Sequence, residues 1–384
     1  MNAEPITKPD TTASDPFSIA ALFTAAENIL DIAPHGDGLI NDSFLVRQRS
    51  GEAFLLQRLN PVVFPDPAGL MHNIRLLGKH WHGGEDAGPT DANPRRAIRL
   101  LLTHEQQDCH YDQAKFCWRA WHFIENSRAL KEITTEAQAE AAGAALGEFH
   151  ARTGDLAPAL LHDTMPEFHV TPCVLRNFDQ IIDSTPAPDG PDVAYCRDFI
   201  HRRRAGAAVL EQGRARGILR ERVIHGDPKV DNILFDRDCD RALALVDLDT
   251  VKPGLLQYDV GDCLRSCCNR AGDNPDQPGQ AEFDPDLARA LLTGYLAKMR
   301  GLLTRHDLAC FYEAVHLITF ELGVRFFSDY LAGNRYFKVD DPEHSLRRAL
   351  TQFGLAASIE KREKQIRLIV NELQSFTRAG NLLI

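Results

Sequence analysis

The sequence lacks the features that mark several classes of protein. It contains no run of 18 apolar residues, so it predicts no membrane-spanning helix and no membrane partner. Its first residues show no basic segment followed by an apolar one, so it predicts no secretory signal peptide. Its nine cysteines include no C-x-x-C pair, and scattered thiols in a chain this long indicate a reducing, cytoplasmic environment.

Basic residues are also too few for a nucleic-acid-binding surface. The chain has 43 Lys and Arg against 54 Asp and Glu, which gives a formal net charge of −11 at pH 7. Nucleic-acid-binding domains are usually basic, so this balance predicts no nucleic-acid partner. With 384 residues, 44% of them hydrophobic and 25% charged, the chain has the composition of a soluble globular protein and the length for two domains.

What the sequence does have is a dense group of polar residues between Val223 and Asp249, in the stretch VIHGDPKVDNILFDRDCDRALALVDLD. Within it, the apolar runs 233–235 and 242–246 are separated by the polar turn 236–241. This alternation predicts a β-hairpin preceded by a loop. The hairpin would bring the polar residues before its first strand close to those that follow its second strand.

Phosphoryl transfer accounts for the types of these polar residues, because its catalysis rests on positioning and charge stabilisation. Asp227 is the candidate base that orients the acceptor hydroxyl and takes its proton. Asn232 and Asp247 supply oxygen ligands that suit Mg²⁺, and Lys229 supplies a point charge for the migrating phosphate. Asp249 is either a metal or substrate contact or the cap of a turn. The alternative for the whole group is a hairpin tip with solvated carboxylates.

These motifs resemble those of a known family. HGDPKVDNILFD followed by VDLD is similar to the catalytic and metal loops of the protein-kinase-like fold, in its aminoglycoside phosphotransferase and choline kinase branch. The stretch VDLDTVKPGLLQYDVGDCLR resembles the N-acetylhexosamine 1-kinase group within that branch. The resemblance implies a bilobal α+β fold, with an antiparallel sheet and one helix in the N-lobe and a mainly helical C-lobe. It also implies ATP and Mg²⁺ as cofactors.

The chain divides into three parts on this basis. Residues 1–15 are rich in Pro, Thr, Ser and Asp, which predicts a disordered tail. Residues 16–124 would form the nucleotide-binding N-lobe, and residues 125–384 the catalytic and substrate-binding C-lobe. The Ala-rich stretch 134–152 predicts a helix with a capping box at its start. The many turn residues of the stretch 158–191 predict mostly loop.

The first candidate nucleotide contact is a glycine-containing turn. Gly36 and Gly38 precede a stretch of alternating apolar residues, and backbone amides freed by glycine can approach phosphates closely. Asn41 and Ser43 follow the turn and would add hydrogen bonds to the nucleotide. The alternative is an ordinary hairpin turn with no ligand.

A second candidate is Arg58, the cation of the predicted strand 53–59. The resemblance implies that this strand carries a cation for the α- and β-phosphates. The helix that follows, 66–80, should then offer a Glu to hold the cation, but His72 stands at the expected place. The alternative is an exposed Arg on an edge strand.

Two further segments take their roles from the resemblance. Residues 123–126 would be the hinge that binds the adenine edge, which makes Phe123 and Glu125 candidate nucleotide contacts. Asp259 and Asp262 would brace the catalytic loop from behind.

The acceptor side rests on the stretch 318–340, which also resembles the N-acetylhexosamine 1-kinases. There an Arg and a Tyr eleven residues later contact the sugar, and Arg325 and Tyr336 match that spacing. Arg325 lies among apolar residues, where a cation needs an oxygen-rich partner. The alternative is a helical ion pair, because Glu321 and Asp329 stand four residues on either side of Arg325.

The function implied by the resemblance is ATP- and Mg²⁺-dependent phosphorylation of a small sugar, at the anomeric hydroxyl of an N-acetylhexosamine or related hexose. The alternatives are an aminoglycoside- or choline-type amino-alcohol kinase, and a non-catalytic pseudokinase that only binds ligands. A protein kinase is disfavoured, because Asp247 and Gln257 stand only ten positions apart and leave no room for a long activation segment.

Overall fold

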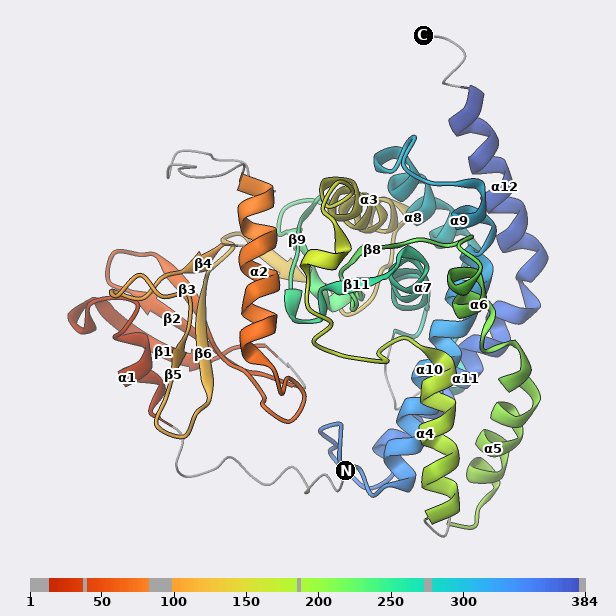
Figure 1. Ribbon diagram of the computed structural model, residues 1–384, viewed down its shortest axis with the longest axis horizontal. Helices are drawn as coiled ribbons and strands as arrows, with labels where there is room; N and C mark the ends of the chain where they lie inside the picture. The colour runs from red at the N-terminus through yellow and green to blue at the C-terminus, as the bar shows by residue number, and fades with distance from the viewer. Residues whose placement is uncertain (1–13, 37–39, 83–98, 185–187, 273–277, 380–384) are drawn as a thin grey trace. The chain divides into compact units, whose positions relative to one another are not determined.

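The computed structural model describes residues 14–36, 40–82, 99–184, 188–272 and 278–379, and these form two compact units (Figure 1). The first unit extends to Asn126 and also takes in Leu161–Thr164 and Arg335–Lys338. The second unit comprises Ser127–Leu160, Met165–Asn334 and the described chain from Val339 onward. The predicted tail lies almost wholly outside the described residues, which begin at Ser14.

The first unit is built on an antiparallel sheet, in which the described strands run in the order β1-β2-β3-β6-β4 and β5 pairs with β6. One sheet face is apolar because alternate residues of neighbouring strands point to the same side. Phe54 and Leu56 of β3 are buried there beside Trp118 of β6, against Ile19 of α1. The strands are β1 (Ile29–Pro34), β2 (Asp42–Gln48), β3 (Ala53–Arg58), β4 (Leu100–Leu101), β5 (His110–Tyr111) and β6 (Cys117–His122).

Two helices accompany this sheet. The short α1 (Pro16–Ala20) begins after Asp15, whose carboxylate accepts a hydrogen bond from the Ser18 amide. The longer α2 (Pro67–His82) confirms the helix predicted after the third strand. The N-lobe predicted from the sequence, an antiparallel sheet with one substantial helix, is therefore present.

The predicted hairpin lies in the second unit, where β9 (Ile233–Asp236) pairs antiparallel with β10 (Ala242–Leu245). Its turn is closed by Asp236, whose carboxylate accepts hydrogen bonds from the Asp238 amide and the Arg241 guanidinium. On its other side β9 pairs with β7 (Ser127–Ala129), and a separate pair joins β8 (Glu221–Ile224) to β11 (Lys252–Leu255).

Helices make up most of the second unit. The predicted Ala-rich helix packs closely on α8, because Gly143 and Gly294 leave no room for a side chain between the two backbones. Its N-terminus is capped by the Thr135 hydroxyl, which accepts a hydrogen bond from the Gln138 amide. The helices are α3 (Glu136–Arg152), α4 (Thr171–Ser184), α5 (Pro191–Arg203), α6 (Val209–Ala215), α7 (Leu256–Cys267), α8 (Pro285–Lys298), α9 (Arg305–Ala309), α10 (Phe311–Leu331), α11 (His344–Lys361) and α12 (Glu363–Ala379).

The prediction that residues 158–191 are mostly loop is wrong, because they contain the 14-residue helix α4. Turn-forming residues gather on both sides of this helix, whereas its interior carries apolar residues at helical spacing. One of them, Phe178, packs on Phe327 of α10 with ring centroids 5.9 Å apart. In the described part of the chain, no helix has the length and apolar character needed to cross a membrane.

Candidate active site

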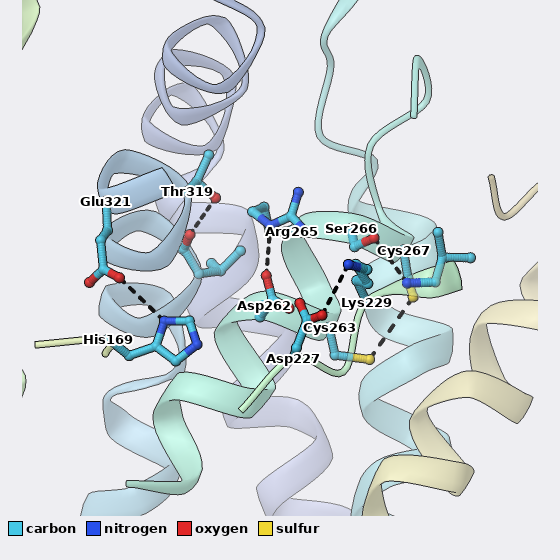
Figure 2. A network of polar contacts seen from close by, with 12 residues as sticks. His169, Asp227, Lys229, Asp262, Cys263, Arg265, Ser266, Cys267, Thr319 and Glu321 are labelled. Atoms are coloured by element: carbon cyan, nitrogen blue, oxygen red, sulfur yellow. Dashed lines mark hydrogen bonds and ion pairs between the residues drawn. The ribbon is translucent and has the colours of Figure 1, made fainter. Parts of the chain in front are cut away.

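Asp227 lies in the loop between β8 and β9, beside two of the residues predicted to work with it. Its carboxylate pairs with the Lys229 ammonium, a contact drawn in Figure 2, and the two groups are 3.0 Å apart. It also accepts a hydrogen bond of 3.0 Å from the Asn232 side chain. Gly226 precedes it with φ +86°, and a Cβ there would stand 2.6 Å from the Thr250 carbonyl oxygen. Only glycine therefore allows this path of the loop.

The charges of this pair suit a general base. Although burial alone would raise the pKa of Asp227, the neighbouring Lys229 holds it below its ordinary value. The attraction of Asp227 in turn raises the pKa of Lys229 against the effect of burial. Both side chains remain about 30% exposed, at 29% and 32%. The result is an ionised carboxylate that a substrate can reach, next to a fixed positive charge.

Asp259 of α7 holds the backbone of this loop from the buried side. Its two carboxylate oxygens accept hydrogen bonds from the amides of His225 and Gly226, at 2.7 and 2.8 Å, and from the His150 ring at 2.8 Å. The His225 ring also bonds to the Val246 carbonyl at 3.0 Å, which ties the loop to the end of β10. The bracing contacts expected of Asp259 are therefore present.

Asp262, expected to share that role, instead pairs with Arg265 on its own helix at 2.8 Å. Burial raises the pKa of Asp262 against the attraction of that guanidinium. The second brace comes from Ser266, whose hydroxyl accepts a 3.0 Å hydrogen bond from the Val230 amide. Sequence reasoning missed Ser266, since a serine near a helix end carries no distinguishing signal.

Asn232 and Asp247 stand at neighbouring ends of β9 and β10. The Val246 amide donates to the Asn232 carbonyl at 2.8 Å, so the next residue, Asp247, begins just beyond that pair. Asp247 has φ +67° and an exposed side chain, whereas Asp249 is only 2% exposed. Because the Asn232 amide nitrogen donates to Asp227, its amide oxygen is the atom left to bind a cation.

This donor set fits a magnesium ion that substrate phosphates complete. Mg²⁺ takes oxygen ligands and is often held by one or two protein groups together with phosphate oxygens. Among the residues that the structure describes, no group of three or more His, Cys, Asp or Glu side chains forms a self-sufficient metal site. An amide oxygen and one carboxylate therefore match a metal that arrives with a nucleotide.

The candidate nucleotide residues lie in the first unit. Gly36 has φ +76° and an open position, whereas Gly38 lies outside the described residues. The Asn41 side chain accepts a 3.0 Å hydrogen bond from the Asn60 amide, and Ser43 accepts one of 3.1 Å from Gln57. Both side chains thus help to hold the strand that follows the turn.

Arg58 has a partner that the sequence did not suggest. Its guanidinium binds Asp42 at 2.6 Å and lies over the Phe116 ring, 4.8 Å from the ring centroid. Lys338 approaches the other oxygen of Asp42 at 3.8 Å. The exposed edge-strand alternative is wrong, because β3 lies between β2 and β6 and the Arg58 side chain is 14% exposed.

The predicted hinge coincides with the end of the first unit at Asn126. Phe123 packs edge-on against His35, with ring centroids 5.6 Å apart, and its amide bonds to the Ala53 carbonyl. Glu125 is exposed.

Residues 31–302 match the phosphotransferase enzyme family, known as APH. The chain belongs to this family. The match covers the catalytic loop, the candidate metal residues and Arg58, and it ends before Arg325 and Tyr336. The APH assignment therefore makes the chain a phosphotransferase.

Solved structures agree with the protein-kinase-like fold of the APH family. An aminoglycoside phosphotransferase from Alicyclobacillus acidocaldarius is 17% identical with a TM-score of 0.60, over 96% of this chain and 98% of that one. A microcompartment-associated aminopropanol kinase is 15% identical with a TM-score of 0.58, over 88% and 95%. An amicoumacin kinase in complex with AMP-PNP and Ca²⁺ is 14% identical with a TM-score of 0.52, over 87% and 91%.

The two candidate acceptor residues of this APH member belong to different units. Arg325 is on α10 in the second unit, with its guanidinium 4.9 Å from the Phe168 ring centroid. The flanking carboxylates have partners on other segments, since Glu321 accepts a hydrogen bond from Thr171 and Asp329 one from Ser345. Tyr336 is 36% exposed in the first unit and packs edge-on against Phe337.

Proposed function

We propose that this APH member is an ATP- and Mg²⁺-dependent kinase that phosphorylates a hydroxyl group of a small molecule. The observation that carries the proposal is the ionised Asp227, held between Lys229 and Asn232 at the end of a hairpin that leads to Asp247. This arrangement supplies a base, a fixed positive charge and two oxygen ligands within one loop and one hairpin. The same arrangement argues against a pseudokinase, which would lack the base or a metal ligand.

The proposed chemistry uses each of these residues once. The Asp227 carboxylate accepts the proton of the acceptor hydroxyl, whose oxygen bonds to the γ-phosphorus while the bond to the ADP oxygen breaks. Lys229 keeps Asp227 ionised and offers positive charge to the transferring group. Asn232 and Asp247 would hold Mg²⁺, which supplies charge neutralisation between the β- and γ-phosphates when bound.

We assign nucleotide binding to the first unit, with Arg58 as the phosphate-binding cation. Gly36, Gly38, Asn41 and Ser43 would cover the phosphates, and Phe123 and Glu125 would lie at the adenine edge. The complex of the amicoumacin kinase with AMP-PNP supports a nucleotide site in this fold. We assign catalysis to the second unit, and Arg325 and Tyr336 are the candidate acceptor contacts.

The acceptor we propose is an N-acetylhexosamine or related hexose, phosphorylated at its anomeric hydroxyl. Arg325 offers a planar group of donors on α10, beside the Phe168 ring, and Tyr336 offers an exposed ring with a hydroxyl. Such donors and rings suit sugar hydroxyls and an amide carbonyl. The proposed acceptor rests on the sequence resemblance together with the surroundings of Arg325 and Tyr336.

A panel of sugars and amino alcohols, followed by ADP release and phosphorus NMR of the product, tests this acceptor. We expect Arg325→Ala and Tyr336→Phe to raise the KM of the sugar and to leave nucleotide binding unchanged. Arg348→Ala is the matched control, since Arg348 lies over the Phe326 ring at 4.1 Å and has no proposed role.

Two results would redirect the proposal. Phosphorylation of a sugar that lacks only its anomeric hydroxyl would move the reaction to another hydroxyl. If an amino alcohol were phosphorylated and no sugar were, the proposed sugar acceptor would be wrong, while the proposed kinase activity would stand. Binding of nucleotide without any Mg²⁺-dependent turnover would contradict the kinase itself.

A further inference from the structure

A buried histidine connects the catalytic loop to helix α10. His169 is 5% exposed and precedes α4, in the stretch where the sequence predicted loop. Its Nε2 is 2.6 Å from the carbonyl oxygen of Gly226, the residue before Asp227. Its Nδ1 is 3.3 Å from the Glu321 carboxylate on α10, and Figure 2 draws this contact as a dashed line.

With Glu321 ionised, both partners of the ring accept hydrogen bonds, and both ring nitrogens donate. A carbonyl oxygen has no proton to give, and the Glu321 carboxylate already accepts a 2.8 Å bond from the Thr171 hydroxyl at its other oxygen. His169 with two N–H groups is an imidazolium, and its charge balances that of Glu321. The two buried charges thus satisfy each other, as buried ions must.

The surroundings favour this charged form. Burial alone would lower the pKa of His169, but the hydrogen bond and charge of Glu321 raise it above the ordinary value. Asp262 of α7 adds attraction from a second side. Tyr258 packs 5.7 Å from the His169 ring, and its hydroxyl donates to Glu211 of α6, a carboxyl whose pKa is raised by burial.

His169 lies close to the proposed acceptor residue Arg325 in two ways, through its neighbour Phe168 and through its partner Glu321. Phe168 lies under the guanidinium of Arg325, the proposed acceptor residue. Glu321, which holds His169, stands four residues before Arg325 on the same helix face. The pair Phe168 and His169 therefore joins the acceptor side of α10 to the peptide that carries the catalytic base.

We propose that His169 is a positioning residue for phosphoryl transfer: as an imidazolium anchored by Glu321, it holds the Gly226 carbonyl and fixes Asp227 relative to the acceptor. This inference rests on the proposed function, since it gives Asp227 and Arg325 the roles assigned above. His169 is buried and acts through the Gly226 carbonyl. Its effect falls on kcat, because it sets the geometry in which the proton is taken.

Two neutral substitutions separate this role from a purely structural one. The amide nitrogen of Gln can replace Nε2 and keep the bond to Gly226, whereas that of Asn replaces Nδ1 and keeps only the bond to Glu321. His169 has φ +66°, in the left-handed region where Asn is favoured. A structural role would therefore make His169→Asn the milder change, and a positioning role would make His169→Gln the milder one.

The experiment measures kcat, both KM values and thermal stability for the two variants. We expect kcat of His169→Asn to fall about 10- to 100-fold, the factor for a lost hydrogen bond from a charged donor, with the nucleotide KM unchanged. His169→Gln should retain clearly more of kcat. Thr171→Val removes the other bond to Glu321 and should lower stability without lowering kcat. A kcat for His169→Asn equal to or above that of His169→Gln would overturn the proposal.

Backbone hydrogen exchange tests whether His169 holds the catalytic loop, and it needs no acceptor substrate. The amides of residues 225–232 should exchange faster in His169→Asn than in His169→Gln, because only the first loses the bond to Gly226. Equal exchange in the two variants would overturn the positioning role. If the wild-type protein turned over no acceptor, the proposed function would fail, while this measurement would still decide whether His169 holds the loop.

Discussion

The cation of the first unit and the base of the second unit are held in different ways. Arg58 is held by one side chain, Asp42, which is 41% exposed. Asp227 sits in a loop whose backbone is held by buried Asp259 and by Ser266. A partly exposed ion pair is worth about 0–1 kcal/mol and can be exchanged for a phosphate, whereas buried bonds to backbone amides keep one geometry. We therefore expect a nucleotide site that can adapt to its ligand and a catalytic loop that keeps one geometry.

The largest expected effect is on the catalytic loop. Asp259→Ala leaves two backbone amides and the His150 ring without their acceptor, and removing one partner of a buried charged network costs about 3–5 kcal/mol. Urea unfolding measures this loss. Asp192→Ala, at an exposed carboxylate of α5, should change the free energy of unfolding by less than about 0.5 kcal/mol. Equal losses in the two variants would show that the loop is not held in this way.

The next effect concerns the metal. Asp247→Ala removes a proposed ligand, and we expect the Mg²⁺ concentration for half-maximal activity to rise about 10- to 100-fold, together with a lower kcat. A titration of activity with Mg²⁺ at saturating nucleotide measures both. If the Mg²⁺ dependence did not change, the ligand would lie elsewhere, and Asp249→Ala would be the next variant to measure.

On the nucleotide side, we expect the paired residues Arg58 and Asp42 to differ in their effect on ATP binding. Arg58→Ala should weaken ATP binding about tenfold, because it removes a charged donor to the phosphates, and should leave the acceptor KM unchanged. Asp42→Asn should weaken ATP binding by less than about threefold, since the ion pair it breaks is partly exposed. Calorimetric titration with ATP measures both. An equal loss of ATP affinity in the two variants would mean that Arg58 binds ATP only when Asp42 holds its side chain in place.

The smallest expected effect is on acid stability. Glu360 binds Arg203 at 2.6 Å and His316 at 2.8 Å; against the opposing effect of burial, these bonds lower its pKa to about 2. A lowered pKa adds stability above the ordinary value of 4.5 and loses it as the pH falls towards 2. Wild-type Tm should therefore fall more between pH 5 and pH 3 than Tm of Glu360→Gln. The exposed pair of Arg47 and Asp31 in the first unit is the control, and Asp31→Asn should leave this slope unchanged.

The same contrast explains what the sequence could predict. The hairpin and the meeting of Asp227, Lys229 and Asn232 followed from residues only a few positions apart, whose types carry the chemistry. The partner of Arg58 could not be predicted, because Asp42 reaches it through the register of β2 and β3. The link from His169 to Glu321 spans 152 positions and leaves no local pattern.

Helix predictions failed where local signals misled. Turn residues on both sides of α4 outweighed the helical spacing of its apolar residues, which pack on α10 through Phe178. By contrast, the cap predicted at Thr135 is confirmed, since capping is decided within one turn. The reciprocal bond of the predicted capping box is different, because the Gln138 side chain accepts from the Thr134 amide.

Turnover and nucleotide binding of Asp227→Asn decide whether Asp227 is the catalytic base. The substitution keeps the size of the side chain and removes the proton acceptor beside Lys229. We expect kcat for acceptor phosphorylation to fall about 10²–10⁴-fold while the Kd of ATP stays within about twofold. A kcat close to that of the wild type, with Mg²⁺-dependent product still formed, would contradict Asp227 as the base of this phosphotransferase.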